Sequence, residues 1–442
     1  MNDLHLSREL LRAIANGDLP PRAFLEMVLH HLFEFCPHCA VEWHAYESEK
    51  HAHTGASGYD SAFSLLSHVL AHQLPRVALA ERAAERDFRD LMRVPPELRA
   101  RRILRSYRRF RGAALAERLI AECRRCVTSR PREAHEFAFL AQLVTNQSSE
   151  PASRELSPLS MAEMANATRA GGDLSEADKI FMRVRKLTLL GGVIDPAVSA
   201  RIDSLEGSLR KDQRRFKEAE EILSRAQFLY EIVGESAQVG RVHVQQATVY
   251  FQMGSLTKAL SVSKKALSLL TPEEDRFLYF FARRLIAIVL VDLDRLAEAI
   301  AILDMDEREH RTLNEPLYQI RYSWLRGRIA AARGDLAAAE RLFVTTRGTF
   351  MQAGIGFDAA MVSLDLALAY LKNGQTAQTK RLAEQIKPLF EAQDMHREAI
   401  AALLLFCEAA EQESLTISFV RELAKFLEAA RADPSYRFRP PS

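Results

Sequence analysis

Histidine and cysteine side chains, which proteins use as zinc ligands, gather near the start of the chain. Nine of the 13 histidines fall within the first 72 residues, and Cys36 and Cys39 form a Cys-Pro-His-Cys run after an expected amphipathic helix. Tetrahedral zinc takes four nitrogen or sulfur ligands. His31, five residues before Cys36, can supply a third. Four protein ligands leave no coordination position for water, so the predicted zinc is structural.

Two other interpretations of this cysteine pair remain open. A Cys-x-x-Cys pair also occurs as unliganded surface thiols or as a redox couple. The redox interpretation requires a β-α-β context, and no segment with the two-residue period of a strand precedes Cys36. The histidines around the pair favour zinc over both alternatives.

A second Cys-x-x-Cys pair, Cys123 and Cys126, lies in a different setting. It ends the strongly helical run 113–126, where Leu115, Leu119 and Cys123 follow the three-and-four spacing of one helix face. Small thiols behave as buried apolar groups in such positions. We predict that these are ordinary helix cysteines and that they bind no metal.

The sequence contains no recognisable catalytic arrangement. It has no Gly-rich phosphate loop, no Gly-x-Ser-x-Gly and no His-Glu-x-x-His motif. Isolated histidines such as His243 and His310 stand in helical stretches and are expected to be ordinary helix residues. We therefore expect that the protein is not an enzyme.

The elements that must position any site follow an internal repeat of 40 residues. Two columns of small residues lie twelve positions apart: Gly207, Ala247, Ala287, Gly327 and Ala367, then Ala219, Ala259, Ala299, Ala339 and Thr379. A third column holds Phe216, Leu256, Leu296, Leu336 and Thr376, and a turn column just ahead of it holds Gly254, Asp294, Gly334 and Gly374. Small residues at fixed points indicate where paired helices approach closely, and each pair must stack on its neighbours to bury its apolar face.

These columns resemble the tetratricopeptide repeat, most fully in the unit that carries Trp324, Gly327, Leu336, Ala339 and Phe343. That repeat is about 34 residues long, so longer helices account for the difference. The chain is similar to the helical repeats of bacterial sensor proteins that bind signal peptides or act beside transcription activators. The resemblance covers residues from about 160 to 430, and it implies an all-α, right-handed superhelical solenoid.

The N-terminal segment resembles the zinc-binding domain of anti-sigma factors. Its pieces are His5, a helix after Ser7, the turn Asn16-Gly-Asp-Leu-Pro-Pro21, a second helix, and the run from His31 to Cys39. The resemblance implies the ligand set His5, His31, Cys36 and Cys39. Four residues separate His31 from Cys36 where the family has three, so His30 and His44 are alternative ligands.

The pattern of linkers and charge divides the chain into five parts. We predict a zinc-binding helical domain at 1–45, a polar linker at 46–62, an irregular basic helical region at 63–155, the repeat array at 156–432 and a tail at 433–442.

The basic region stands out because residues 76–132 contain 17 Arg, no Lys and 7 acidic residues, a net charge of +10 in a chain whose total is +2. Within it, residues 99–111 are expected to form one helix. Its apolar face would carry Ala100, Ile103, Leu104, Tyr107 and Phe110, and its cationic face Arg102, Arg105 and Arg109. The cationic face suits solvent or the chain's own acidic repeats, then an acidic partner, and least of all nucleic acid, because the aromatic residues face inward.

Two function classes fit these observations. In the first, a groove formed by the first helix of each repeat binds an extended peptide or a partner helix; its expected lining is Arg241, Val244, Gln245, Thr248, Phe251, Arg284, Ile288, Arg321, Trp324 and Arg328. In the second, the chain is a transcription regulator whose N-terminal domain binds a sigma factor while the repeats sense a signal. No run approaches the roughly 18 apolar residues of a membrane span and no secretory leader is visible, so a cytoplasmic location is expected.

The zinc prediction can be tested by metal analysis. Freshly purified protein should carry close to one zinc ion per chain, and Cys36→Ser or Cys39→Ser should remove it, because each takes away a thiolate ligand. The control, Cys123→Ser, should leave the zinc content unchanged. Absence of zinc from protein that was purified without a chelator would contradict the prediction.

Overall fold

A computed structural model of the chain describes residues 74–106, 109–148, 150–190, 195–312, 316–391, 403–404, 406–410, 415–430 and 438. The predicted metal ligands His5, His31, Cys36 and Cys39 lie outside these residues, as do the parts predicted at 1–45 and 46–62.

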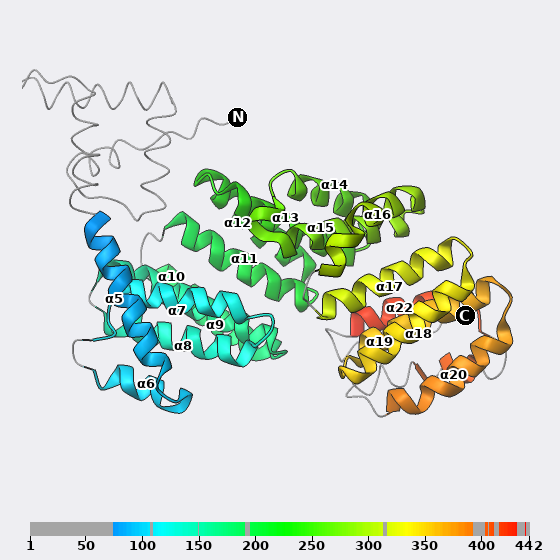
Figure 1. Ribbon diagram of the computed structural model, residues 1–442, viewed down its shortest axis with the longest axis horizontal. Helices are drawn as coiled ribbons and strands as arrows, with labels where there is room; N and C mark the ends of the chain where they lie inside the picture. Colours follow the sequence, from blue (N-terminus) through cyan, green and yellow to red (C-terminus); the bar gives the residue numbers. More distant parts are fainter. Residues whose placement is uncertain are drawn as a thin grey trace, which may run out of the picture. The chain divides into compact units, whose positions relative to one another are not determined.

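Every regular element among the described residues is an α-helix (Figure 1), as the sequence predicts. The helices are α5 (Leu74–Met92), α6 (Pro96–Leu104), α7 (Ala113–Cys126), α8 (Pro131–Gln147), α9 (Pro151–Ala170), α10 (Leu174–Leu190), α11 (Pro196–Asp212), α12 (Phe216–Ile232), α13 (Ser236–Gln252), α14 (Leu256–Leu267), α15 (Pro272–Asp292), α16 (Leu296–Thr312), α17 (Pro316–Ala332), α18 (Leu336–Gln352), α19 (Gly356–Lys372), α20 (Thr376–Glu391) and α22 (Ile417–Ala430). None of them is long and apolar enough to cross a membrane.

The chain forms two compact units. The first consists of residues 1–209 and 217–239, and the second of residues 210–216 and 240–442. In the first unit α7, α8, α9 and α10 pack in sequence order, and α7 also contacts α9. In the second, α14 to α20 pack in sequence order, with further contacts of α15 to α17 and of α17 to α19. We call the first helix of each pair (α13, α15, α17, α19) helix A and the second helix B. The right-handed superhelix stays a prediction.

The turn from helix A to helix B has the same geometry in five successive repeats. Helix B begins at Phe216, Leu256, Leu296, Leu336 and Thr376, the predicted column. Two positions earlier stand residues with φ between 58° and 81°: Arg214, Gly254, Asp294, Gly334 and Gly374. The amide one position later bonds to a carbonyl five residues back, as in Ser255 N to Tyr250 O at 2.9 Å. This is the Schellman ending of a helix, which requires a left-handed residue and so favours glycine.

Helix α15 keeps the 40-residue register in spite of an added turn. It starts at Pro272, but the backbone at Asp275 is not helical. The Asp275 carboxylate accepts a hydrogen bond from the Leu278 amide at 2.9 Å, so it caps the helical segment that follows. That segment therefore begins 40 residues after Ser236 of α13.

The columns of small residues lie where paired helices touch, as predicted. A methyl group added to Gly207 would lie 2.6 Å from the Leu223 side chain, and one added to Gly327 would lie 2.7 Å from the Phe343 ring. The alanines at positions 219, 259, 299 and 339 are fully buried. Nothing larger fits at these points without separating the two helices.

In the first unit a buried carboxylate joins three helices. Glu163 of α9 is fully buried, and its Oε1 lies 2.6 Å from Arg124 Nε of α7 and 2.9 Å from Arg201 Nε of α11. Burial by itself would raise the pKa of Glu163, but the charges and hydrogen bonds of the two arginines outweigh it and hold this pKa below its ordinary value.

The close contact predicts opposite effects at two glycines of neighbouring helices. Gly327→Ala should lower the free energy of unfolding by about 1–3 kcal/mol, because the buried Phe343 ring has no room to move. A methyl group added at Gly348 of α18 would have no other atom within 4 Å. Gly348→Ala should therefore raise the free energy of unfolding by about 0.5–1 kcal/mol. Urea denaturation of both variants measures the difference; equal effects would show that the helix contact is misplaced.

The buried carboxylate predicts a pH dependence. Because the pKa of Glu163 is lowered on folding, its stabilisation is complete above the unfolded value of about 4.3 and is lost as pH falls through the folded pKa. Glu163→Ala should cost about 3–5 kcal/mol at pH 7, since it leaves two arginines unpaired. The variant should also lose less unfolding free energy than the parent as the pH is lowered, as measured by urea denaturation at a series of pH values. The same pH dependence in the variant and the parent would contradict this account.

Candidate ligand-binding surface

Each helix A of the second unit is largely covered and carries a stripe of partly exposed residues at helical spacing. In α13 the stripe carries Arg241, Gln245 and Thr248, and in α17 it carries Arg321, Trp324 and Arg328. The spacing of three and four residues places each set on one side of its helix. We call the stripes of α13 (from residue 240), α15, α17 and α19 together the helix-A face.

Ion pairs join each stripe of this face to the next. Arg241 of α13 lies 2.6 Å from Asp275 of α15, and Arg321 of α17 lies 2.9 Å from Asp358 of α19. Arg328 of α17 pairs with Asp292 of α15. The arginines thus use carboxylates one repeat away, which fixes their side chains across the face.

Trp324 is held at the junction of α17 and α19. Its indole N–H donates a hydrogen bond of 2.6 Å to Asp365 Oδ2, and its ring meets Phe350 edge-on at 6.0 Å. Arg328 Nε lies 3.8 Å from the same Asp365 oxygen. Burial raises the pKa of Asp365 above its ordinary value, although Arg328 and Trp324 oppose the shift. The indole is therefore fixed in place while part of it faces solvent.

Arg284 of α15 differs from the other arginines of the face. Its side chain is only 7% exposed, its Nε is buried without a hydrogen-bond partner, and no ion pair to it occurs within the described part of the chain. Its guanidinium lies 5.1 Å from the ring centre of Phe281 and 5.3 Å from that of Tyr318. Burial lowers the pKa of Arg284 to about 10.

The remaining predicted lining residues are mainly structural. Thr248 donates its hydroxyl to Val244 O of its own helix at 2.8 Å, and Val244 is buried. Phe251 and Ile288 are partly buried against the core between α13 and α17. The structure thus brings Arg284, Arg321, Trp324 and Arg328 together across α15 and α17, and places Arg241 and Thr248 on the neighbouring stripe.

Sequence reasoning missed the four acidic partners of this face, Asp275, Asp292, Asp358 and Asp365. One signal was available: each lies 34 to 41 residues from the residue it binds, about one repeat away. In a stacked array that separation places side chains on adjacent first helices.

The prediction of a single Arg-rich helix over residues 99–111 is wrong. Helix α6 ends at Leu104, and Phe110 has φ of 63°, which a right-handed helix excludes. Ile103 and Phe110 are buried as expected, but Leu104 is 58% exposed. Arg109 therefore does not share a helical face with Arg102 and Arg105.

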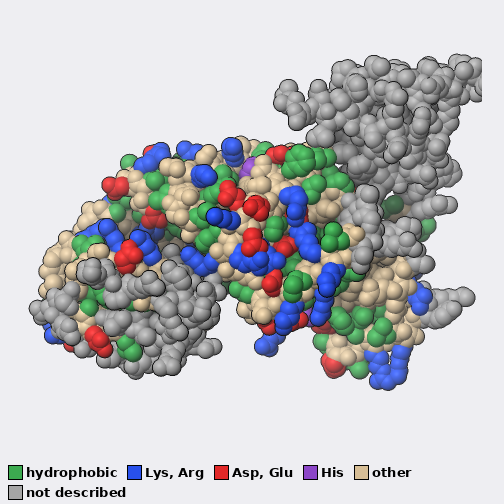
Figure 2. Space-filling view, turned by 180° about the vertical axis from the view of Figure 1, so that it is seen from behind, with side chains coloured by type: hydrophobic (Ala, Val, Ile, Leu, Met, Phe, Trp, Pro, Cys, Tyr) green, Lys and Arg blue, Asp and Glu red, His purple; other side chains and the backbone are tan. Residues whose placement is uncertain are grey.

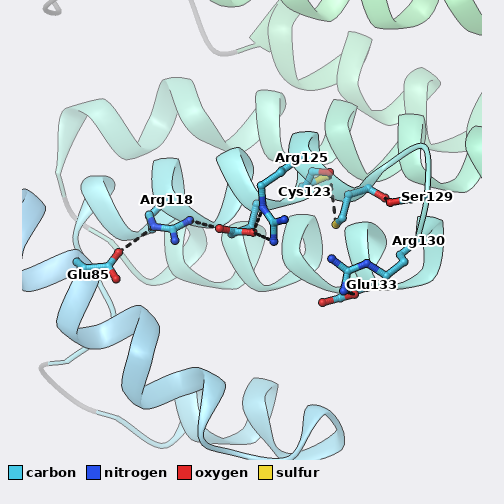
Figure 3. Close-up of polar contacts among 9 residues, drawn as sticks. Glu85, Arg118, Cys123, Arg125, Ser129, Arg130 and Glu133 are labelled. Atoms are coloured by element: carbon cyan, nitrogen blue, oxygen red, sulfur yellow. Dashed lines mark hydrogen bonds and ion pairs between the residues drawn. The ribbon is translucent and has the colours of Figure 1, made fainter. Parts of the chain in front are cut away.

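Several arginines of the basic region pair with acidic residues of the same unit, most of them in the basic region itself, while Arg124 pairs with Glu163 of α9 in the predicted repeat array. Arg109 bonds to Asp87 at 2.6 Å and to Asp90 at 2.5 Å, both in α5, and its hydrogen bond holds the pKa of Asp90 below the ordinary value. Figure 3 shows Arg118 of α7 reaching Glu85 of α5. Cationic and acidic side chains are interspersed on the face drawn in Figure 2.

The two helix cysteines are buried helix residues, as predicted. Cys123 and Cys126 are both fully buried and unbridged, and burial raises the pKa of both thiols. Within the described ranges no group of three or more His, Cys, Asp or Glu residues could hold a metal ion.

Comparison with known proteins shows a shared fold. No protein-family model and no curated protein matches the sequence. Among solved structures, the crystal structure of Rap protein complexed with competence and sporulation factor aligns with 73% of this chain and 88% of that chain. The TM-score is 0.56 and the identity 14%. An identity this low carries the fold alone, and the all-helical structure described above is accordingly a TPR-like repeat fold.

Proposed function

We propose that this protein binds an extended peptide, or an extended segment of a partner protein, along the helix-A face of its second unit, and that it acts by binding and not by catalysis. One observation carries the proposal: a partly exposed Trp324 is fixed beside Arg321 and Arg328 on one side of α17, and Arg241 of α13 is held by the intervening α15. Trp and Arg are the residues most enriched where binding energy concentrates.

The rigidity of the face supports the same role. Its arginines and Trp324 are held by carboxylates one repeat away, so little side-chain entropy is lost when a ligand arrives. The similar fold of Rap protein, solved in complex with competence and sporulation factor, supports binding of another molecule by such a scaffold.

A structural zinc module at the N-terminus remains part of the proposal. It rests on His5, His31, Cys36 and Cys39 in the sequence. We propose that it serves as a second docking module, in the cytoplasm, beside the peptide-binding repeats.

The proposal can be tested with two matched substitutions. Thr248 on the helix-A face and Thr345 on helix B α18 both donate their hydroxyls to their own helix, at 2.8 Å each. With fluorescent hexapeptides selected on the parent chain from a random pool, Thr248→Arg should weaken binding at least tenfold, about 1.4 kcal/mol, because the long side chain fills the face. Thr345→Arg should leave the affinity unchanged.

Fluorescence anisotropy reports both affinities. Equal affinities for the two variants would place the ligand elsewhere, and a pool from which no hexapeptide is selected would overturn the proposed function.

A further inference from the structure

Arg284 is the arginine of the helix-A face whose charge is buried without a carboxylate to pair with it among the described residues. The other arginines of the face, at positions 241, 321 and 328, each pair with an aspartate. Arg284 is nine-tenths buried and has neither a hydrogen bond nor an ion pair within the described part of the chain. Taking a charge out of water without pairing it is costly, and a fold has no need of such a residue at this point.

The charge is retained in spite of this cost. Burial lowers the pKa of Arg284 only to about 10, so the guanidinium is cationic at neutral pH. The rings of Phe281 and Tyr318 lie 5.1 and 5.3 Å from it, and cation–π contacts of this kind return only about 0.5–2 kcal/mol. The site therefore holds a cation that is stabilised by aromatic rings and lacks an anion.

The aromatic cluster around this cation reaches the surface. Phe277 is 40% exposed and packs edge-on against Tyr318, with ring centres 5.8 Å apart. Arg321, close enough to act electrostatically on Arg284, is itself partly exposed. The cluster around the buried guanidinium therefore has members that are exposed to solvent.

We propose that Arg284 anchors a carboxylate of the bound ligand; this inference rests on the proposed function and names the chemistry that the helix-A face selects. A guanidinium offers paired N–H donors that match the two oxygens of a carboxylate. The neighbouring arginines are already occupied by aspartates, so one positive charge is available. A single carboxylate fits one charge better than a doubly charged phosphate does. The carboxylate comes from the C-terminus of a peptide or from an Asp or Glu side chain.

The inference has a readout in the free protein. Arg284→Met replaces a buried unpaired cation by an apolar side chain of similar length, so it should raise the melting temperature of the unliganded chain. A residue kept for the fold would show a lower melting temperature on the same change. The control is Arg326→Met in α17, whose exposed side chain pairs with Glu307 at 3.5 Å and should melt like the parent.

The binding experiment uses hexapeptide pools on the full-length chain. One pool ends in a free carboxylate and lacks Asp and Glu, a second ends in an amide but contains them, and a third ends in an amide and lacks them. We expect one of the first two pools to bind at least tenfold more tightly than the third, which identifies the source of the carboxylate. Arg284→Met should remove that preference, while Arg326→Met keeps it.

Each outcome decides between the two proposals. Selection of hexapeptides with equal affinity from all three pools would overturn the role of Arg284 and leave peptide binding in place. A preference for carboxylate that survives Arg284→Met would do the same. If no pool binds, the proposed function and this inference both fail. The comparison among pools on the parent chain needs no variant, so it holds even if Arg284→Met does not fold.

Discussion

The close approach of paired helices at small residues is the constraint on which the repeat depends. At Gly207 and Gly327 the facing side chain lies where a methyl group would have to be. The alanine column of helix B meets the same limit and is fully buried. Close contact on both flanks covers most of each helix A, so the polar side chains of the helix-A face have few possible partners. The ion pairs across the helix-A face follow from that restriction.

The two units use buried charge in opposite ways. In the first, Glu163 is enclosed but compensated by Arg124 and Arg201, and its net effect is to tie three helices together. In the second, Arg284 is nearly as enclosed and has aromatic rings for neighbours instead of a carboxylate. The pairing of Glu163 stabilises the fold, whereas burial of Arg284 without a carboxylate is unfavourable for the protein alone; in our proposal a ligand carboxylate completes the pairing. This contrast makes the helix-A face a binding surface in our account.

Much of the fold could be predicted from sequence because it rests on size and backbone conformation. The turn column predicted the positions of Gly254, Asp294, Gly334 and Gly374, which all have positive φ. The columns of small residues predicted where paired helices contact each other. The partners of Arg241, Arg321 and Trp324 could not be found that way, since they depend on side chains a repeat apart meeting in space. The helix expected over residues 99–111 was wrong because helical periodicity does not reveal a left-handed residue such as Phe110.

The most direct measurement for the central claim is hydrogen exchange of the full chain with and without a hexapeptide selected on it. Binding to a stripe of helix A slows opening of the helices that carry it. The account predicts that added protection is greatest in α13, α15, α17 and α19 of the second unit. Protection confined to the helices B α14, α16 and α18, or to the first unit, would contradict it.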